Sequence, residues 1–323
     1  MSIKEYLNIQ PKVIKMLLNS YNKQRLAHAY LFEGAKGTKK KALAIELAKL
    51  LYCEKQGEVC NECINCIRIE HQNHPNVLVV EADNNTIKKE QVLYLQQEYH
   101  KTTLEPGPKV YIIDKIEKMS INAANSILKF IEEPVADTYT ILTTDNLHQI
   151  LPTIISRCQV INFQPIPKAS IVNYLIENGV DTYIAGICSH LTNDFDKALE
   201  IANNDKIINI IDLVIMISQA ILNKQEDIIV LLENSNVDLT KDKKVSEYFL
   251  DVLLIYLRDI QNVKNNNFEI VFVNDLNFIQ QYVVNISKEK LIYNINEVLK
   301  AKINLEYNAN LVLLIDHLLL NLM

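Results

Sequence analysis

The sequence contains little glycine and little proline. Only 6 Gly and 8 Pro occur among 323 residues. Turn-rich β architectures, collagen-like repeats and disordered low-complexity segments need more of these residues, so we exclude these classes. Apolar residues make up 49% of the chain and charged residues 22%. We therefore expect a globular, helix-rich chain that is long enough for two or three domains.

An excess of positive charge and long apolar runs are also missing. The formal net charge is -6, which does not favour nucleic acid or an anionic membrane as the dominant nonspecific partner. The N-terminal segment has no apolar core of signal-peptide length. The most apolar run, Leu311 to Leu322, contains Asp316 and His317 and is too short to span a bilayer. We expect a cytoplasmic protein whose last helix packs against other helices.

Five short apolar segments in the first half of the chain predict a parallel sheet. They are residues 29–33, 76–81, 109–114, 138–144 and 159–163. Their continuous apolar character is typical of parallel strands that are buried on both faces. Residues 40–51 and 120–131 lie between these segments and have helical spacing. The pattern predicts an α/β fold with helices on both faces of the sheet.

Pro165 and Pro167 mark a domain boundary, because strand-like segments largely disappear after them. The rest of the chain is predicted to be helical. The predicted domains are an α/β domain at 1–166 with an insertion at 53–66, a small helical domain at 167–208, and a larger helical domain at 209–323.

Four of the six cysteines lie close together in the sequence. Cys53, Cys60, Cys63 and Cys66 are separated by six, two and two residues. In a reducing compartment such spacing favours a metal site over disulfides. Four thiolates suit tetrahedral Zn²⁺ and leave no open position, so the site would be structural. The alternatives are a four-iron cluster, a ligand role for His71 or His74, and four free thiols.

Residues 34–42, GAKGTKKKA, resemble a phosphate-binding loop that lacks two of its fixed positions. In the pattern G-x-x-x-x-G-K-[ST], Gly34 is the first glycine and Lys40 is the lysine. Lys39 replaces the second glycine, which lets the backbone approach the phosphates, and Lys41 replaces the hydroxyl that binds magnesium. The loop alone is a weak indication of nucleotide binding.

Asp114 follows the third strand-like segment, where a nucleotide hydrolase holds magnesium through a carboxylate. The next residue is Lys115. Enzymes with two acidic residues here use the second to activate water, and a protonated lysine cannot act as this base. ATP hydrolysis at this site is therefore not expected. The interpretation that Asp114 only ends the strand is at least as well supported as magnesium binding. Arg157, which precedes the fifth strand-like segment, would on its own be interpreted as a solvated charge.

Taken in order, these segments resemble the family of delta-prime subunits of the bacterial DNA polymerase III clamp loader, in the AAA+ superfamily. The resemblance is carried by HAYLFEGAKGTKKKALA, CEKQGEVCNECINC, HPNVLVVEA, KVYIIDKIEKMSINAANSILKFIEEP and ILPTIISRCQVINF. It covers about half of the chain strongly and is looser beyond Pro167. It implies an AAA+ α/β module, a helical lid and an α-helical collar. Thr143 and Thr144 fall at the family's first sensor.

The resemblance also assigns roles to residues. It implies that the four cysteines form a zinc knuckle and that Gly34, Gly37, Lys40 and Asp114 form a degenerate nucleotide site. Ser156, Arg157 and Cys158 match the family's Ser-Arg-Cys motif, whose arginine acts in trans on a neighbour's ATP. The resemblance places Asp196 at the position of the arginine in the motor subunit's lid. Together with Lys39, Lys41 and Lys115, this departure implies a subunit that does not turn over ATP, and ATP binding by this chain is not expected.

The function implied by the resemblance is that of a non-catalytic subunit of the DNA polymerase III holoenzyme, a nucleotidyltransferase complex. Its partners would be gamma/tau-type motor subunits and the delta subunit in a hetero-pentamer, and, through the complex, the sliding clamp and primed DNA, with no membrane. The competing hypothesis is a divergent motor ATPase that uses Lys40 and Asp114. A third is a zinc-dependent nucleic-acid-binding module, which the acidic balance and the lack of aromatic residues in basic stretches disfavour.

Overall fold

The chain forms two compact units, Met1–Pro167 and Lys168–Met323. This computed structural model describes residues 6–7, 9–55, 57–83, 86–100, 105–132, 137–222, 231–232, 235, 237–267, 269–307 and 309–322. The boundary between the units lies beside the prolines that end the strand-rich half. The further division of the second unit at residue 208 stays a prediction.

The N-terminal unit contains a five-stranded parallel sheet, as the sequence predicted. Its strands are β1 (Ala29–Glu33), β2 (Val77–Val80), β3 (Lys109–Ile113), β4 (Thr138–Thr144) and β5 (Gln159–Asn162), in the order β2-β3-β4-β1-β5. Every strand lies within a segment predicted from its apolar run. The α/β fold class is therefore confirmed.

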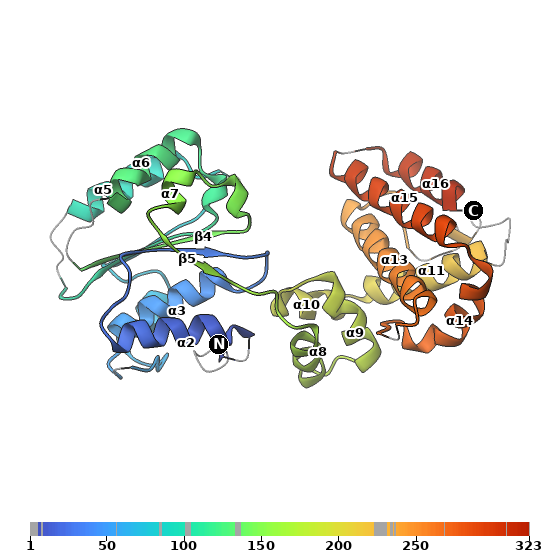
Figure 1. Cartoon of the computed structure of the whole chain (residues 1–323), viewed down its shortest axis with the longest axis horizontal. Coiled ribbons are helices and arrows are strands. Elements are labelled where there is room, and N and C mark those ends of the chain that lie inside the picture. The colour runs from blue at the N-terminus through green and yellow to red at the C-terminus, as the bar shows by residue number, and fades with distance from the viewer. Residues whose placement is uncertain are drawn as a thin grey trace. The chain divides into compact units, whose positions relative to one another are not determined.

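Helices cover both faces of the sheet, because alternate residues of each strand point to opposite faces. In β1, Tyr30 and Phe32 pack towards α2 (Pro11–Asn22) and α3 (Lys40–Tyr52), and α4 (Ile64–Glu70) joins this layer. Ala29 and Leu31 pack on the opposite layer. That layer contains α5 (Lys89–His100), α6 (Ile121–Glu132) and α7 (Pro152–Ile155). Figure 1 shows the two helical layers on either side of the sheet.

Gly34 follows β1 at a point where three chain segments converge. Its N–H donates to Thr144 O across 3.3 Å, and the N–H of Phe163 donates to Glu33 O across 2.7 Å. A Cβ at residue 34 would lie 2.6 Å from Phe163 O. This glycine is therefore required by the close approach of β5's exit, whether or not a phosphate ever binds the loop.

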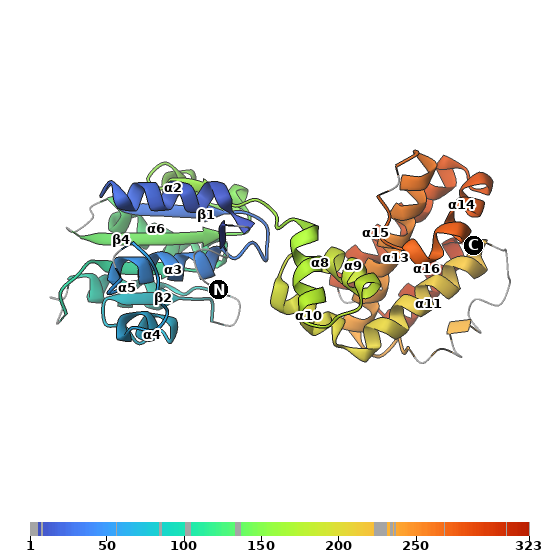
Figure 2. The same ribbon diagram turned by 90° about the horizontal axis from the view of Figure 1, so that it is seen from below.

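The described part of the second unit is helical. Its helices are α8 (Lys168–Glu177), α9 (Thr182–Leu191), α10 (Phe195–Ala202), α11 (Asp205–Leu222), α13 (Lys243–Lys264), α14 (Leu276–Asn285), α15 (Lys288–Glu306) and α16 (Leu311–Leu322) (Figure 2). The apolar residues of α13 are buried among its neighbours, including Phe249 and Tyr256, which are 0% exposed. Within the described residues, no helix combines the length and apolarity that crossing a membrane requires.

Candidate functional site

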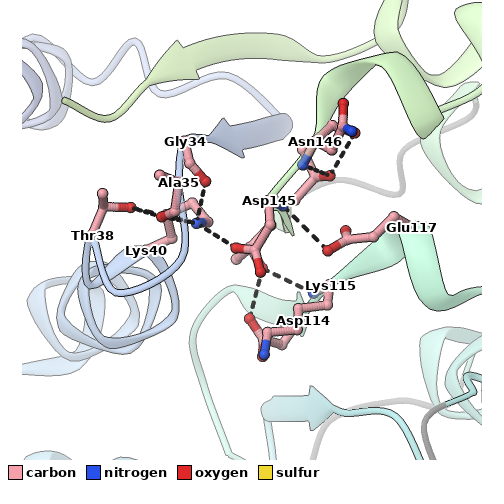
Figure 3. Close-up of polar contacts among 11 residues, drawn as sticks. Gly34, Ala35, Thr38, Lys40, Asp114, Lys115, Glu117, Asp145 and Asn146 are labelled. Carbon is pink, nitrogen blue, oxygen red and sulfur yellow. Dashed lines mark hydrogen bonds and ion pairs between the residues drawn. The ribbon is translucent and has the colours of Figure 1, made fainter. Parts of the chain in front are cut away.

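The carboxyl ends of β1, β3 and β4 bring together residues of the predicted degenerate nucleotide site (Figure 3). Lys40 begins α3, and its ammonium points back into the loop that follows β1. It donates to Gly34 O across 2.6 Å, to Ala35 O across 3.0 Å and to Asp145 Oδ1 across 2.7 Å. The Lys40 side chain is only 6% exposed. Its charge is therefore satisfied by the loop and by a carboxylate of the chain itself.

Lys39 and Lys41, which replace the second glycine and the hydroxyl residue of a phosphate-binding loop, do not have the properties that nucleotide binding needs. Lys39 precedes α3 with φ 63°, a left-handed conformation that glycine adopts at lower cost. Lys41 Nζ pairs with Glu81 Oε1 across 2.5 Å. An ammonium group cannot ligate magnesium, and its positive charge repels the ion. The position of the magnesium-binding hydroxyl thus holds a cation.

Asp114 follows β3, next to the end of β4. Its Oδ1 accepts a hydrogen bond from Thr143 Oγ1 across 2.6 Å, and Thr143 Oγ1 accepts from the N–H of Lys115 across 2.9 Å. The register of β3 with β4 explains this contact, because Ile113 lies opposite Leu142. The candidate magnesium carboxylate and the threonine at the family's first-sensor position therefore contact each other directly.

Asp145 and Glu117 belong to this site but were missed by the sequence analysis. Asp145 pairs with Lys40, and its N–H donates to Glu117 Oε1 across 3.2 Å. Glu117 lies in the short helix η1 (Ile116–Lys118). The position of Asp145 directly after Thr143 and Thr144, at the end of a buried strand, was the available signal, because strand ends meet at one edge of a parallel sheet.

Arg157 lies directly after α7, apart from the loop that holds Lys40. Its Nη1 donates to Thr153 O across 2.9 Å and to Ser156 Oγ across 3.3 Å, and its Nη2 pairs with Glu132 Oε1. The side chain is 35% exposed. Its neighbour Cys158 is half-buried, and burial raises the pKa of that thiol to about 12. Arg157 can therefore be reached from outside the chain.

The lid position assigned to Asp196 lies in the first turn of α10. Asp194 caps this helix, and its Oδ1 accepts from the N–H groups of Asp196 and Lys197. A carboxylate in a first helical turn is favoured by the helix dipole. The helix dipole of α10 is thus a local structural reason for an acidic residue at position 196. This reason does not depend on the difference from the motor subunit.

The structure brings together the four predicted cysteines. The Sγ atoms of Cys53, Cys60, Cys63 and Cys66 all lie within 4.8 Å of one another. The Cys60 N–H points at Cys53 Sγ and the Cys63 N–H at Cys60 Sγ, each across 3.3 Å. Such donors stabilise thiolates; backbone N–H groups of Glu62 and Cys63 lower the pKa of the Cys60 thiol to about 6. The cluster can hold a metal ion.

Lys49 fastens this cysteine cluster to α3. Its buried ammonium donates to Glu46 Oε1 and to Asn61 Oδ1, each across 2.8 Å, and pairs with Glu70 Oε2 across 2.5 Å. Asn61 lies between the second and third cysteines and Glu70 ends α4, so the Lys49 side chain connects both the cysteine loop and the end of α4 to α3. This arrangement fixes the cluster's position relative to the sheet.

Neither of the two histidines considered as extra ligands belongs to the group of ligand atoms found among the described residues. His74 is 3% exposed and packs on Tyr52, with 4.3 Å between ring centroids. Its Nδ1 accepts from the N–H of Asn76 across 3.2 Å. Burial lowers the pKa of this imidazole. His74 is a packing residue of the core, while His71 is exposed at the end of α4.

The parallel sheet, the modified phosphate loop after β1 and the helices in the described part of the second unit define an AAA+ α/β module followed by a helical region. The family model described as "DNA polymerase III, delta subunit" matches residues 9–167. DNA polymerase III subunit delta' of Bacillus subtilis (strain 168) is 39% identical over 323 residues, covering 99% of this chain and 98% of that protein. The chain belongs to the family of delta-prime subunits of DNA polymerase III.

Two further relatives match about half of the chain. DNA polymerase III subunit tau of Bacillus subtilis is 37% identical over 168 residues, which cover 50% of this chain and 29% of that protein. Subunit delta' of Pseudomonas aeruginosa is 37% identical over 148 residues, which cover 45% of each. About half of the chain is therefore similar both to delta-prime and to tau subunits.

Proposed function

We propose that this chain is a non-catalytic subunit of a DNA polymerase III clamp loader. The observation that carries the proposal is the cation at the magnesium-ligand position, where Lys41 pairs with Glu81. Phosphoryl transfer from ATP needs a metal ion that neutralises charge on the phosphates. A site with an ammonium in place of the hydroxyl ligand, and Lys115 in place of the base, cannot supply this chemistry.

The competing function, a divergent motor ATPase, would use Lys40 and Asp114. Both side chains have partners within the chain: Lys40 pairs with Asp145, and Asp114 accepts from Thr143. A nucleotide would have to displace a carboxylate from Lys40 before its phosphates could bind. These contacts favour a site that keeps the fold of a nucleotide site without its turnover.

The contribution of the chain to ATP hydrolysis is then made in trans. Arg157 is exposed and carries a fork of donors that matches phosphate oxygens. In a ring whose nucleotide sites lie between subunits, such an arginine reaches the phosphate bound by the next subunit and stabilises charge in the transition state. Ser156 and Cys158 flank it in the loop after α7.

The cysteine cluster is proposed to hold one structural Zn²⁺. Four thiolates around zinc at about 2.3 Å lie roughly 3.8 Å apart in a tetrahedron, and the four sulfurs here need only a small adjustment to reach it. The set offers no open position for a substrate. The ion would order the insertion between α3 and β2.

The second unit is proposed to provide the lid, at about 167–208, and the collar, at about 209–323. In α16 one leucine-rich face is buried, yet Leu313 and Leu320 on the same helix are 68% and 60% exposed. On α15, Leu299 and Ile303 are 44% and 54% exposed. The bundle therefore leaves apolar surface on these two helices, which supports assembly with other subunits.

The proposed partners are gamma/tau-type motor subunits and a delta subunit in a hetero-pentamer, and the sliding clamp and primed DNA through that complex. The test is nucleotide binding by the isolated chain together with co-purification with the other loader subunits. We expect assembly without magnesium-dependent ATP binding or turnover. Micromolar ATP binding with turnover by the isolated chain would instead support the ATPase hypothesis.

A further inference from the structure

Glu132 is the carboxylate that pairs with Arg157. It is the last described residue of α6, and its Oε1 accepts from Arg157 Nη2. The C-terminal end of a helix carries partial negative charge, so a carboxylate is unfavourable there unless a cation lies beside it. Arg157 supplies that cation from α7's end. The pair therefore joins two helices that are 20 residues or more apart in the sequence.

The other side of the guanidinium is held by α7 itself. Nη1 donates to Thr153 O and to Ser156 Oγ, and Ser156 Oγ donates to Thr153 O across 3.1 Å. A guanidinium offers five N–H groups, and these contacts together with the Glu132 pair engage three of them. An incoming phosphate oxygen can thus approach the guanidinium while it still contacts α7.

The contact with Glu132 opposes the use of Arg157 on a phosphate. A neighbouring carboxylate cancels part of the positive charge that would stabilise the transition state. The pair is also exposed, with 35% of Arg157 and 44% of Glu132 accessible, so solvent and salt weaken it. A terminal phosphate carries more charge than one carboxylate and accepts a bidentate contact, so it can displace Glu132.

We propose that Glu132 is a positioning residue that holds the Arg157 guanidinium when no phosphate contacts it. The phosphate of ATP bound to the neighbouring subunit must then displace Glu132 from the guanidinium. This inference rests on the proposed role of Arg157 in trans. Its consequence is that Glu132 competes with the bound triphosphate for the guanidinium and so lowers the rate of ATP turnover in the loader.

The test is Glu132→Gln in the full-length chain, reconstituted with the motor and delta subunits. Glutamine keeps the shape and an accepting oxygen and removes the charge. ATP turnover measured without DNA and clamp should rise by about two- to fivefold, the size expected for loss of an exposed ion pair. Glu177→Gln is the matched control, because Glu177 is also an exposed carboxylate at the end of a helix, α8. It should leave turnover unchanged.

Arg157→Ala and the double variant separate this inference from the function on which it rests. The double variant should match Arg157→Ala, because Glu132 acts only through the arginine. Unchanged or lower turnover in Glu132→Gln, with Arg157→Ala reduced, would overturn the role of Glu132 and leave the arginine's role intact. A rise that persists without Arg157 would also overturn it. If Arg157→Ala has no effect on turnover, the proposed role of Arg157 in trans is wrong, and the role of Glu132 that rests on it is wrong as well. Circular dichroism and co-purification confirm that each variant folds and assembles.

Discussion

Lys40 donates to Asp145 across 2.7 Å, and this pair joins the loop after β1 to the loop after β4. The two residues are 105 positions apart in the sequence. Lys40 also holds the carbonyl oxygens of Gly34 and Ala35, so one ammonium closes the loop and fastens it to the neighbouring strand end. The lysine of the phosphate loop is thus used here to hold the loop together.

Lys40→Met is expected to lower the free energy of unfolding by about 1–3 kcal/mol, because it leaves a carboxylate and two carbonyl groups without their buried donor. Urea denaturation followed by circular dichroism measures the change. Lys36→Met is the control, since Lys36 is exposed in the same loop, and its effect should stay within about 0.5 kcal/mol. ATP turnover per assembled loader should not change. Loss of turnover with unaltered stability would favour the divergent ATPase.

Cys63→Ser should remove the metal from the knuckle. Because each thiolate supplies one of four ligands, we expect zinc content to fall from one ion per chain towards none, and the insertion to become more sensitive to proteolysis while the sheet stays folded. Elemental analysis of protein purified without chelators measures the metal. Cys158→Ala should keep the ion. Iron with visible absorption would establish the cluster alternative, and absence of any metal in the parent protein would contradict the zinc site.

Leu313→Glu should weaken assembly with the other loader subunits. The leucine is 68% exposed on α16, so a charge there costs the isolated chain little but is unfavourable in a buried interface. Size-exclusion chromatography with light scattering measures the complex. Ile176→Glu on α8, where the side chain is 41% exposed, is the matched control and should assemble normally. Equal assembly by both variants would show that α16 does not form the collar contact.

His190 predicts a pH dependence of stability in the second unit. Burial lowers its pKa, and the charges of Arg258 and Lys168 lower it further, against a raising contact with Gly186 O. The unfolded chain therefore binds more protons than the folded chain once the pH falls below about 6.5, the usual value for histidine. The free energy of unfolding should decrease as the pH falls through that value. His190→Gln should make the free energy of unfolding depend less steeply on pH between pH 7 and 5.5. An unchanged dependence would show that other groups cause it.

The sequence predicted what local patterns determine. The three central strands, β3, β4 and β1, are almost completely buried, so each appears as a largely apolar run, whereas Gln159 and Asn162 of the edge strand β5 are exposed. The four cysteines lie within 14 residues of one another. Helix α5 was not predicted because few of its residues are apolar; Val92 and Leu95 are its buried ones. Pairings between distant segments, such as Lys40 with Asp145, depend on the order of strands in the sheet and could not be read from spacing.

Arg157 was placed in a functional motif only through family resemblance. A single arginine in a loop has no periodicity or spacing that separates it from a solvated charge. Its contact with Glu132 depends on how α6 and α7 pack, and the sequence patterns of these two segments do not predict that packing. The structure therefore identifies Glu132 as the residue that pairs with Arg157, and the family resemblance suggests that Arg157 acts in trans.

Arg157 is proposed to act on ATP held by a neighbouring subunit. Arg157→Ala should leave folding, metal content and assembly intact, and should lower DNA-stimulated ATP hydrolysis and clamp loading by the reconstituted complex. An arginine supplied in trans contributes about 10³–10⁵ in rate in other nucleotide hydrolases, and a loader with several sites should lose less because this chain serves one of them. Lys at this position should rescue only part of the activity, since it keeps the charge and loses the fork.

The most direct measurement is the steady-state rate of DNA-stimulated ATP hydrolysis by loaders that contain either the parent chain or Arg157→Ala at equal stoichiometry. We expect a lower rate for the variant complex, with no change in the amount of complex formed. An equal rate in the two complexes would show that Arg157 does not act in trans and is a surface charge that pairs with Glu132.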